Sequence, residues 1–278
     1  MRKRLLVRAD DVGYTEAFDL GAMKAIDEGI VTSADVMLDS PHTKEVLLWL
    51  KERPWISIGW HRHLWESPVL PPEEVPSLVD EEGRFKWRHN RQDLKKEATY
   101  EDAYKELSAE LELCKAIYGR YPETATLRNQ DIPLEKAMRQ VCYDYRINTL
   151  VWTYVDAREP EALPPSQKPL KEKQDRFDLV KFKDYDPIGQ FLKTTWEYDG
   201  QIRRTGGHPG YLDDHILAES TCSIHRVRDL QKMIDPRVKQ FIIDNKVELA
   251  NSRDIIYGTT QVQDHLKEIN SPLWIGNM

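Results

Sequence analysis

Two adjacent carboxylates end the first hydrophobic run of the chain. Asp10 and Asp11 follow "RLLVRA" directly and lead into a segment that contains a glycine. Successive strand residues point to opposite faces, but both side chains can reach one cavity where the strand turns into a loop. One carboxylate could then bind a divalent cation while the other takes a proton from water. A plain turn that leads into a helix explains the same two residues equally well.

A pair of histidines ends a later hydrophobic run. His61 and His63 stand two residues apart in "GWHRHL", so on a strand they would share one face and could bind one metal ion. Histidines satisfied within the core are the alternative for an isolated pair. Because this pair follows the two carboxylates at a neighbouring strand end, the metal-ligand interpretation is favoured.

Two more polar clusters occur in the last third of the chain. His208 stands in "GGHPGYLDD", where glycines permit close backbone approach and a proline stiffens the loop. It could protonate a leaving group or bind a metal, and a simple turn histidine is the alternative. Arg226 and Arg228 in "HRVRDL" could keep a nearby carboxylate ionised, although most arginines at such a helix start lie on the surface.

The elements that would position these residues alternate along the chain. Apolar runs predict strands, and 3.6-residue periodicity predicts helices between them. Thr15 is a plausible N-cap of the first helix. The strands are expected at 4–10, 31–38, 55–64, 124–128 and 147–155, and the helices at 15–30, 43–53, 101–120, 133–145 and 226–234. This alternation predicts a parallel sheet in one α/β barrel-like domain over residues 1–278, with active-site residues at the strand ends.

Two long segments interrupt this alternation. Residues 65–100 are rich in proline, glutamate and charge, and a loop of that length is usually functional or partly disordered. Residues 158–175 contain four prolines and are expected to form a loop.

Composition excludes several classes of protein. The net charge of −7 and pI near 5.7 argue against a nucleic-acid binder, and no apolar stretch approaches the ~20 residues of a membrane span. The apolar run after "MRKR" is too short for a signal peptide. Three widely spaced cysteines without a C-x-x-C pair indicate reduced thiols and a cytoplasmic location. The sequence leaves a homodimer open and contains no P-loop, nucleophile elbow or dinucleotide fingerprint.

Taken together, these motifs resemble the YdjC-like carbohydrate deacetylase family, which includes the chitooligosaccharide deacetylases. The similarity extends over nearly the whole chain, from the Asp-Asp opening through the Gly-x-His strand to the His-Pro motif. The segments that carry it are "RADDVGYTEAFDLGAMKAIDEGIVTSADVML", "IGWHRHL", "PSLVDEEGRF", "GGHPGYLDD", "HRVRDLQKM" and "VELANSRDI".

The resemblance implies an irregular, TIM-like (β/α) barrel that hydrolyses the acetyl amide of an amino sugar, with a small carbohydrate as substrate. By position, Asp10 matches the family's general base and Asp11 its metal-binding carboxylate. His61 matches a metal-ligating histidine and His208 the general acid. Arg226 matches an arginine near the base.

One segment departs from the family's pattern. The family has a strand of the form Thr-His-x-Asp-Ser-His-x-His that supplies another metal ligand, whereas residues 123–133 here contain no histidine and place Arg128 and Asn129 there. Either His63 takes over the missing coordination, giving a site of Asp11, His61 and His63, or the cation is lost and the chemistry has changed. The ligand types leave magnesium, zinc or manganese open.

Two alternatives to an N-deacetylase therefore stay open. One is a hydrolase of the same barrel that cleaves a different bond of a modified sugar. The other is a non-catalytic sugar-binding protein without the metal. In either an enzyme or a binding protein, Trp60, Trp65 and Trp87 are expected to be exposed and could stack on sugar rings.

Overall fold

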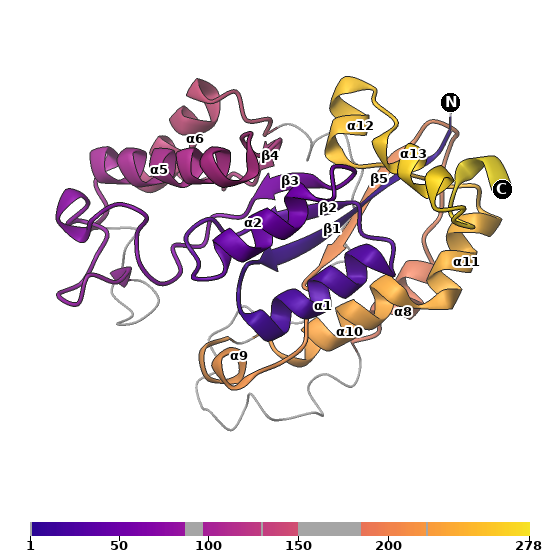
Figure 1. Cartoon of the computed structure of the whole chain (residues 1–278), viewed down its shortest axis with the longest axis horizontal. Helices are drawn as coiled ribbons and strands as arrows, with labels where there is room; N and C mark the ends of the chain where they lie inside the picture. The colour runs from indigo at the N-terminus through magenta and orange to yellow at the C-terminus, as the bar shows by residue number, and fades with distance from the viewer. Residues whose placement is uncertain (1, 87–96, 129, 150–184, 221) are drawn as a thin grey trace.

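A parallel sheet lies at the centre of the molecule (Figure 1). The computed structural model describes residues 2–86, 97–128, 130–149, 185–220 and 222–278. In the described part, the strands follow the order β4-β3-β2-β1-β5, and β6 also pairs with β1. The strands are β1 (Arg4–Val12), β2 (Ser33–Val36), β3 (Ser57–Trp60), β4 (Thr124–Ala125), β5 (Ile202–Gly207) and β6 (Glu248–Leu249). All of these pairings are parallel.

The first strand holds the sheet together. β1 pairs with β5 along residues 4–9, with β6 at its amino end and with β2 toward its carboxyl end. Its apolar residues are buried on both faces, as is usual for an interior strand of a parallel sheet. These pairings fix the position of the residues at the carboxyl end of β1.

Helices surround the sheet as the alternation of the sequence predicts. They are α1 (Glu16–Asp27), α2 (Thr43–Lys51), α5 (Tyr100–Tyr118), α6 (Pro133–Asp144), α8 (Pro187–Leu192), α9 (Asp214–Glu219), α10 (Ile224–Ile234), α11 (Pro236–Asp244), α12 (Ser252–Tyr257) and α13 (Gln261–Glu268). Short 3₁₀ turns occupy Pro72–Glu74 and Ile275–Asn277. The side chain of Thr15 accepts a hydrogen bond from the Phe18 amide, which confirms the predicted N-cap of α1. Among the described helices, none has the length and apolar character that crossing a membrane requires.

The strands form part of a TIM-like barrel, as the sequence predicts. The succession β1-α1-β2-α2-β3 appears in the predicted order, and β4 and β5 end the described sheet. Asn148 forms a parallel bridge with Thr124, so the strand predicted at 147–155 begins beside β4. The rest of that strand and the proline-rich loop at 158–175 lie outside the described residues.

The predicted loop at 65–100 is partly packed on the core. Val75, Leu78 and Phe85 are buried, and Val79 and Phe85 form an antiparallel bridge. Residues 87–96, which include Trp87, lie outside the described part of the chain. The residues before this gap, 65–86, are therefore held on the core by buried apolar side chains.

The third strand is shorter than the sequence predicts. A strand was expected over 55–64, whereas β3 ends at Trp60, so His61 and His63 lie in the loop that follows it. β4 offers only two residues for pairing, and the last pair joins Trp60 to Ala125. Within the described part of the chain, no pairing continues the ladder beyond Trp60, and Leu64 adopts a positive φ of 56° in the loop that follows.

Candidate metal and active site

The candidate residues meet at the carboxyl ends of the parallel strands. Asp10 and Asp11 lie near the end of β1, His61 follows β3, and His208 follows β5 directly. Arg226 reaches the same place from α10. Barrels of this architecture carry their active sites at this end of the strands, so the meeting point agrees with the fold.

An irregularity in β1 brings both carboxylates to one side. Three steps from Ala9 to Val12 on β1 match two steps from Ala34 to Val36 on β2, so one extra residue is inserted in β1. Asp11 within this bulge has a φ of 62°, a left-handed conformation that aspartate tolerates better than most residues. Bulges commonly re-aim a side chain next to an active site. The bulge explains how two successive residues can serve one site.

The two oxygens of Asp11 face different partners. Its Oδ1 lies 3.0 Å from Nε2 of His61 and 2.9 Å from Nε2 of His63. Its Oδ2 lies 2.9 Å from Nη2 of Arg226 and 3.9 Å from Nε2 of His208. Oδ1 therefore faces His61 and His63, and Oδ2 faces Arg226 and the loop that contains His208.

The charges around Asp11 keep it ionised. Burial disfavours the carboxylate, but the neighbouring His63, His208 and Arg226 outweigh that effect and hold the pKa of Asp11 well below its usual range. For His61, burial disfavours the cationic ring, yet the hydrogen bond and charge of Asp11 raise the pKa of the imidazole. The two groups therefore stabilise each other's charged forms.

Asp10 is held by a residue that sequence reasoning missed. Arg8 forms a two-pronged ion pair with Asp10, through its Nε and, at 2.8 Å, through its Nη2. Nη1 of Arg8 also lies 3.2 Å from Asp35 on β2. Burial raises the pKa of Asp35 to about 6, against the opposing effect of Arg8. Arg8 precedes Asp10 by two residues, a spacing that places both on one strand face and could have suggested the pair.

His208 is anchored by a second missed residue, Asp229 of α10. The backbone amide of His208 donates to Oδ2 of Asp229 at 2.8 Å, and Nδ1 of the ring lies 3.9 Å from the same oxygen. The hydroxyl of Tyr185 donates to Oδ1 of Asp229 at 2.5 Å. Burial opposes ionisation of Asp229, but Lys232, His208 and Tyr185 lower its pKa to about 2. Asp229 stands three residues after Arg226, on the same helix face, and that spacing is the signal that could have found it.

The two predicted arginines have different surroundings. Arg226 is buried, donates from Nε to the carbonyl of Cys222 at 2.7 Å, and lies over the rings of Tyr14 and Phe18. It was expected beside the proposed base, whereas the carboxylate it contacts is Asp11 and the arginine on Asp10 is Arg8. Arg228 binds the carbonyl of Tyr185 instead and fixes that backbone.

Two sets of side chains could hold a cation among the described residues. Asp11, His61 and His63 form one, and Asp10, Asp35 and His61 form the other. Both oxygens of Asp10 already accept contacts from Arg8, which neutralises the second set. Two imidazole nitrogens and a carboxylate oxygen are a chemically suitable donor set for a divalent transition metal. The first set therefore fits a cation better.

The segment that lacks histidine has a different organisation. Glu135 of α6 pairs with the buried guanidinium of Arg62 and accepts the backbone amide of Arg128 at 3.2 Å. Burial and the nearby Arg62 lower the pKa of Arg128. Arginine takes the place expected for a metal ligand, and Asn129 lies outside the described residues.

Two of the three tryptophans proposed to stack on sugars are buried in the core. Trp60 is fully buried and donates its indole N–H to Glu110 at 2.6 Å. Trp65 is also buried and packs against the rings of Tyr14 and His215. The prediction that these tryptophans are exposed was wrong, because both fill the core behind the histidine loop.

Known proteins resemble this chain over most of its length. Residues 4–244 match the model of a family described as YdjC-like protein. A carbohydrate deacetylase of Enterococcus faecalis is 27% identical over 277 residues, covering 90% of this chain and 97% of the relative. A chitooligosaccharide deacetylase of Serratia marcescens is 25% identical over 265 residues, covering 92% and 100%. A solved structure from Enterococcus faecalis, described as a candidate cellobiose-phosphate cleavage protein, is 23% identical with a TM-score of 0.65 and covers 92% of this chain and 99% of that one. At that identity, the structural likeness shows the shared fold alone.

Proposed function

The chain belongs to the YdjC-like protein family, and from this premise we propose that it is a metal-dependent hydrolase that removes the acetyl group from an N-acetylated amino sugar or oligosaccharide. Relatives that align over nearly their whole length are named as carbohydrate and chitooligosaccharide deacetylases. The convergence of Asp11, His61 and His63 at the strand ends supports the proposal most directly.

Asp11, His61 and His63 would hold the cation. When bound there, a divalent metal supplies Lewis-acid activation of water and of the acetyl carbonyl. Arg226 contacts the other oxygen of Asp11 at 2.9 Å, so it fixes the carboxylate while Oδ1 stays directed at the imidazoles. His63 takes the ligand position that residues 123–133 leave without a histidine.

Asp10 is the proposed general base. Hydrolysis of the amide requires that a proton leave the attacking water as the new C–O bond forms. The two-pronged ion pair with Arg8 keeps the carboxylate in one orientation beside the ligand set. The extra residue in β1, which lets Asp10 and Asp11 serve one site, supports a base beside a metal ligand.

His208 is the proposed general acid. The C–N bond breaks to release acetate, and the departing nitrogen must receive a proton to leave as an amine. Nε2 of His208 lies 3.9 Å from Asp11 Oδ2, at the edge of the ligand cluster. Asp229 acts as a positioning residue, because it binds the backbone amide of His208 and is itself fixed by Tyr185.

A second candidate is a hydrolase of the same barrel that cleaves a different bond of a modified sugar. The observation that favours it is the arginine pair Arg62 and Arg128 in the segment where a metal ligand was expected. A substrate panel of N-acetyl, O-acetyl and phosphorylated sugars separates the two candidates. Release of acetate from N-acetyl sugars supports the first, and turnover restricted to another bond supports the second.

Metal content and activity together test the proposal. Purified protein is freed of metal, reloaded with zinc, magnesium or manganese, and assayed for acetate release from N-acetylglucosamine oligomers. The variant Asp11→Asn is expected to lose both bound metal and activity, while His42→Ala, a histidine of the α2 N-terminus, is expected to keep both. Full activity in the metal-free protein, or in Asp11→Asn, would contradict the proposal. Binding of oligomers without any turnover would identify a sugar-binding protein instead.

A further inference from the structure

A separate cavity opens at the amino ends of β3 and β4. It has a volume of about 310 Å³, and its lining includes Arg120, Glu123, Arg146, Arg253 and Tyr257. These residues come from the turn before β4, from the segment after α6 and from α12. Because the strands are parallel and Asp11 lies at their carboxyl ends, this cavity is at the opposite end of the sheet from the candidate active site.

The buried charges in this cavity are balanced. Nη1 of Arg253 pairs with Oε1 of Glu123 at 2.6 Å, and both side chains are 6% exposed. Oε2 of Glu123 accepts the amide of Ile58 at 2.6 Å. The other nitrogens of Arg253 bind the side chain of Gln261 and the carbonyl of Ile56. Glu123 and Arg253 therefore satisfy each other's charge and hydrogen bonds, and we assign this pair a structural role.

Two further arginines leave a positive charge at the mouth of the cavity. Arg120 lies 3.4 Å from Glu123 through Nε and binds the Tyr118 hydroxyl through Nη2, while 42% of its side chain stays exposed. Arg146 is an exposed residue with a φ of 57°, and among the described residues no hydrogen bond or ion pair holds its guanidinium. Three arginines against one glutamate make the lining positive in a chain whose net charge is −7.

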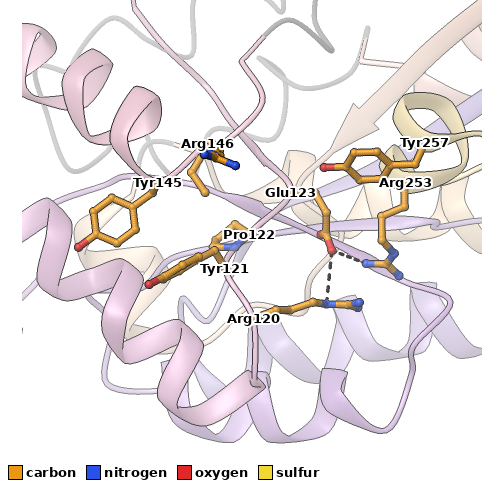
Figure 2. Close-up of a pocket in the computed structure, with 9 residues that line it drawn as sticks. Arg120, Tyr121, Pro122, Glu123, Tyr145, Arg146, Arg253 and Tyr257 are labelled. Atoms are coloured by element: carbon orange, nitrogen blue, oxygen red, sulfur yellow. Dashed lines mark hydrogen bonds and ion pairs between the residues drawn. The ribbon is translucent and has the colours of Figure 1, made fainter.

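Aromatic rings complete the lining. Figure 2 shows Tyr145 and Tyr257 on opposite sides, with Arg146 between them. Tyr257 is 64% exposed, and Tyr145 packs edge-on against Tyr121 with ring centroids 5.0 Å apart. Ring faces next to guanidinium groups suit a ligand that has an anionic end and a flat or apolar body.

We propose that this cavity binds a small phosphomonoester, with its phosphate group at the exposed guanidinium of Arg146 and its body against Tyr257. Guanidinium groups match the geometry of phosphate oxygens and bind them through paired hydrogen bonds. The cavity volume is at the lower limit of ~300 Å³ for small-molecule sites, which suits a sugar phosphate or a mononucleotide. Both sources share the phosphate chemistry, and the body of the ligand distinguishes them.

Calorimetric titration of the full chain tests this proposal, with inorganic phosphate, glucose 6-phosphate and adenosine monophosphate as probes. We expect one saturable site that binds at least one phosphomonoester more tightly than inorganic phosphate. The identity of the tighter phosphomonoester shows whether the body is a sugar or a nucleoside. Absence of saturation by all three probes at about 10 mM, well above the range of specific small-molecule binding, would overturn the proposal.

Matched arginine variants locate the binding. Arg146→Ala is expected to weaken the phosphomonoester at least about tenfold, which corresponds to one lost charged hydrogen-bond pair. The melting temperature should stay unchanged, because Arg146 is exposed. Arg237→Ala removes an exposed arginine on α11, remote from the cavity, and should leave the affinity as it is. If Arg146→Ala and Arg120→Ala both bind like the unaltered protein, the anion binds elsewhere and the proposal is wrong.

Discussion

The two ends of the sheet use a buried carboxylate in opposite ways. At the amino end, both oxygens of Glu123 are occupied by Arg253 and by a backbone amide, so the group has a structural role. At the carboxyl end, one oxygen of Asp11 faces two imidazoles, which can exchange their protons for a metal ion. Burial and charge alone therefore do not identify a functional carboxylate, whereas the chemical nature of its partners distinguishes the two roles.

The largest expected effect is at the carboxyl end, in the variant Asp10→Asn. Loss of a general base typically slows a reaction about 100- to 10,000-fold, so kcat for acetate release should fall by this factor. The metal content should not change, because Asp10 lies outside the proposed ligand set. Asp264→Asn on α13 is the matched control and should retain full activity. Wild-type turnover in Asp10→Asn would remove this residue from the mechanism.

At the amino end, Glu123→Gln should affect stability and leave the proposed metal site intact. The substitution leaves Arg253 without its buried counter-charge, which typically costs about 3–5 kcal/mol of the free energy of unfolding. Denaturant unfolding measures this loss, and metal content in the folded fraction measures the site. The exposed Glu112→Gln, whose carboxylate accepts the Tyr121 hydroxyl at the surface, should change stability little. A loss of metal with stability unchanged would reverse the assignment of the two ends.

The histidine pair tests the proposed ligand set at the carboxyl end of the sheet. His63→Ala should weaken metal binding at least about tenfold, because it removes one of three proposed ligands. Competition with a chelator, read by elemental analysis, measures the affinity, and His42→Ala provides the control. Unchanged affinity in His63→Ala would show that the replacement ligand comes from elsewhere in the chain.

A further effect of modest size concerns acid stability through Asp229. Its pKa is lowered from 3.8 to about 2, so it stabilises the folded state above pH 3.8 and loses this contribution as the pH falls toward 2. A shift of this size corresponds to about 2 kcal/mol. Unfolding followed between pH 5 and pH 2 should show a shallower pH dependence in Asp229→Asn than in the unaltered chain. Equal slopes would mean that Asp229 has an ordinary pKa in the folded protein.

Local patterns predicted most of the framework. Apolar runs bounded by caps and breakers identified β1, α1 and β2, and Thr15 was recognised because N-caps depend on a few neighbouring residues. The end of β3 could not be predicted, since a strand continues only while its neighbour offers pairing partners. Strand length in a sheet is a property of two chain segments together.

The candidate site was predicted in part for a similar reason. Histidines and adjacent carboxylates are rare enough in such patterns to attract attention from sequence alone. Arg8 shares a strand face with Asp10, whereas strand register brings Asp35 to Arg8 and helix docking brings Asp229 to His208. The burial of Trp60 was missed because its polar partner, Glu110, lies 50 residues away.

The extra residue in β1 has a consequence for protein engineering. Side chains alternate along a strand, so a design that copies Asp10 and Asp11 onto a regular strand would send one of them away from the cavity. Transplanting this site into another barrel therefore requires the inserted residue and the left-handed backbone at Asp11 along with the side chains. The backbone irregularity has to be transferred first, because side chains can then be introduced by single substitutions.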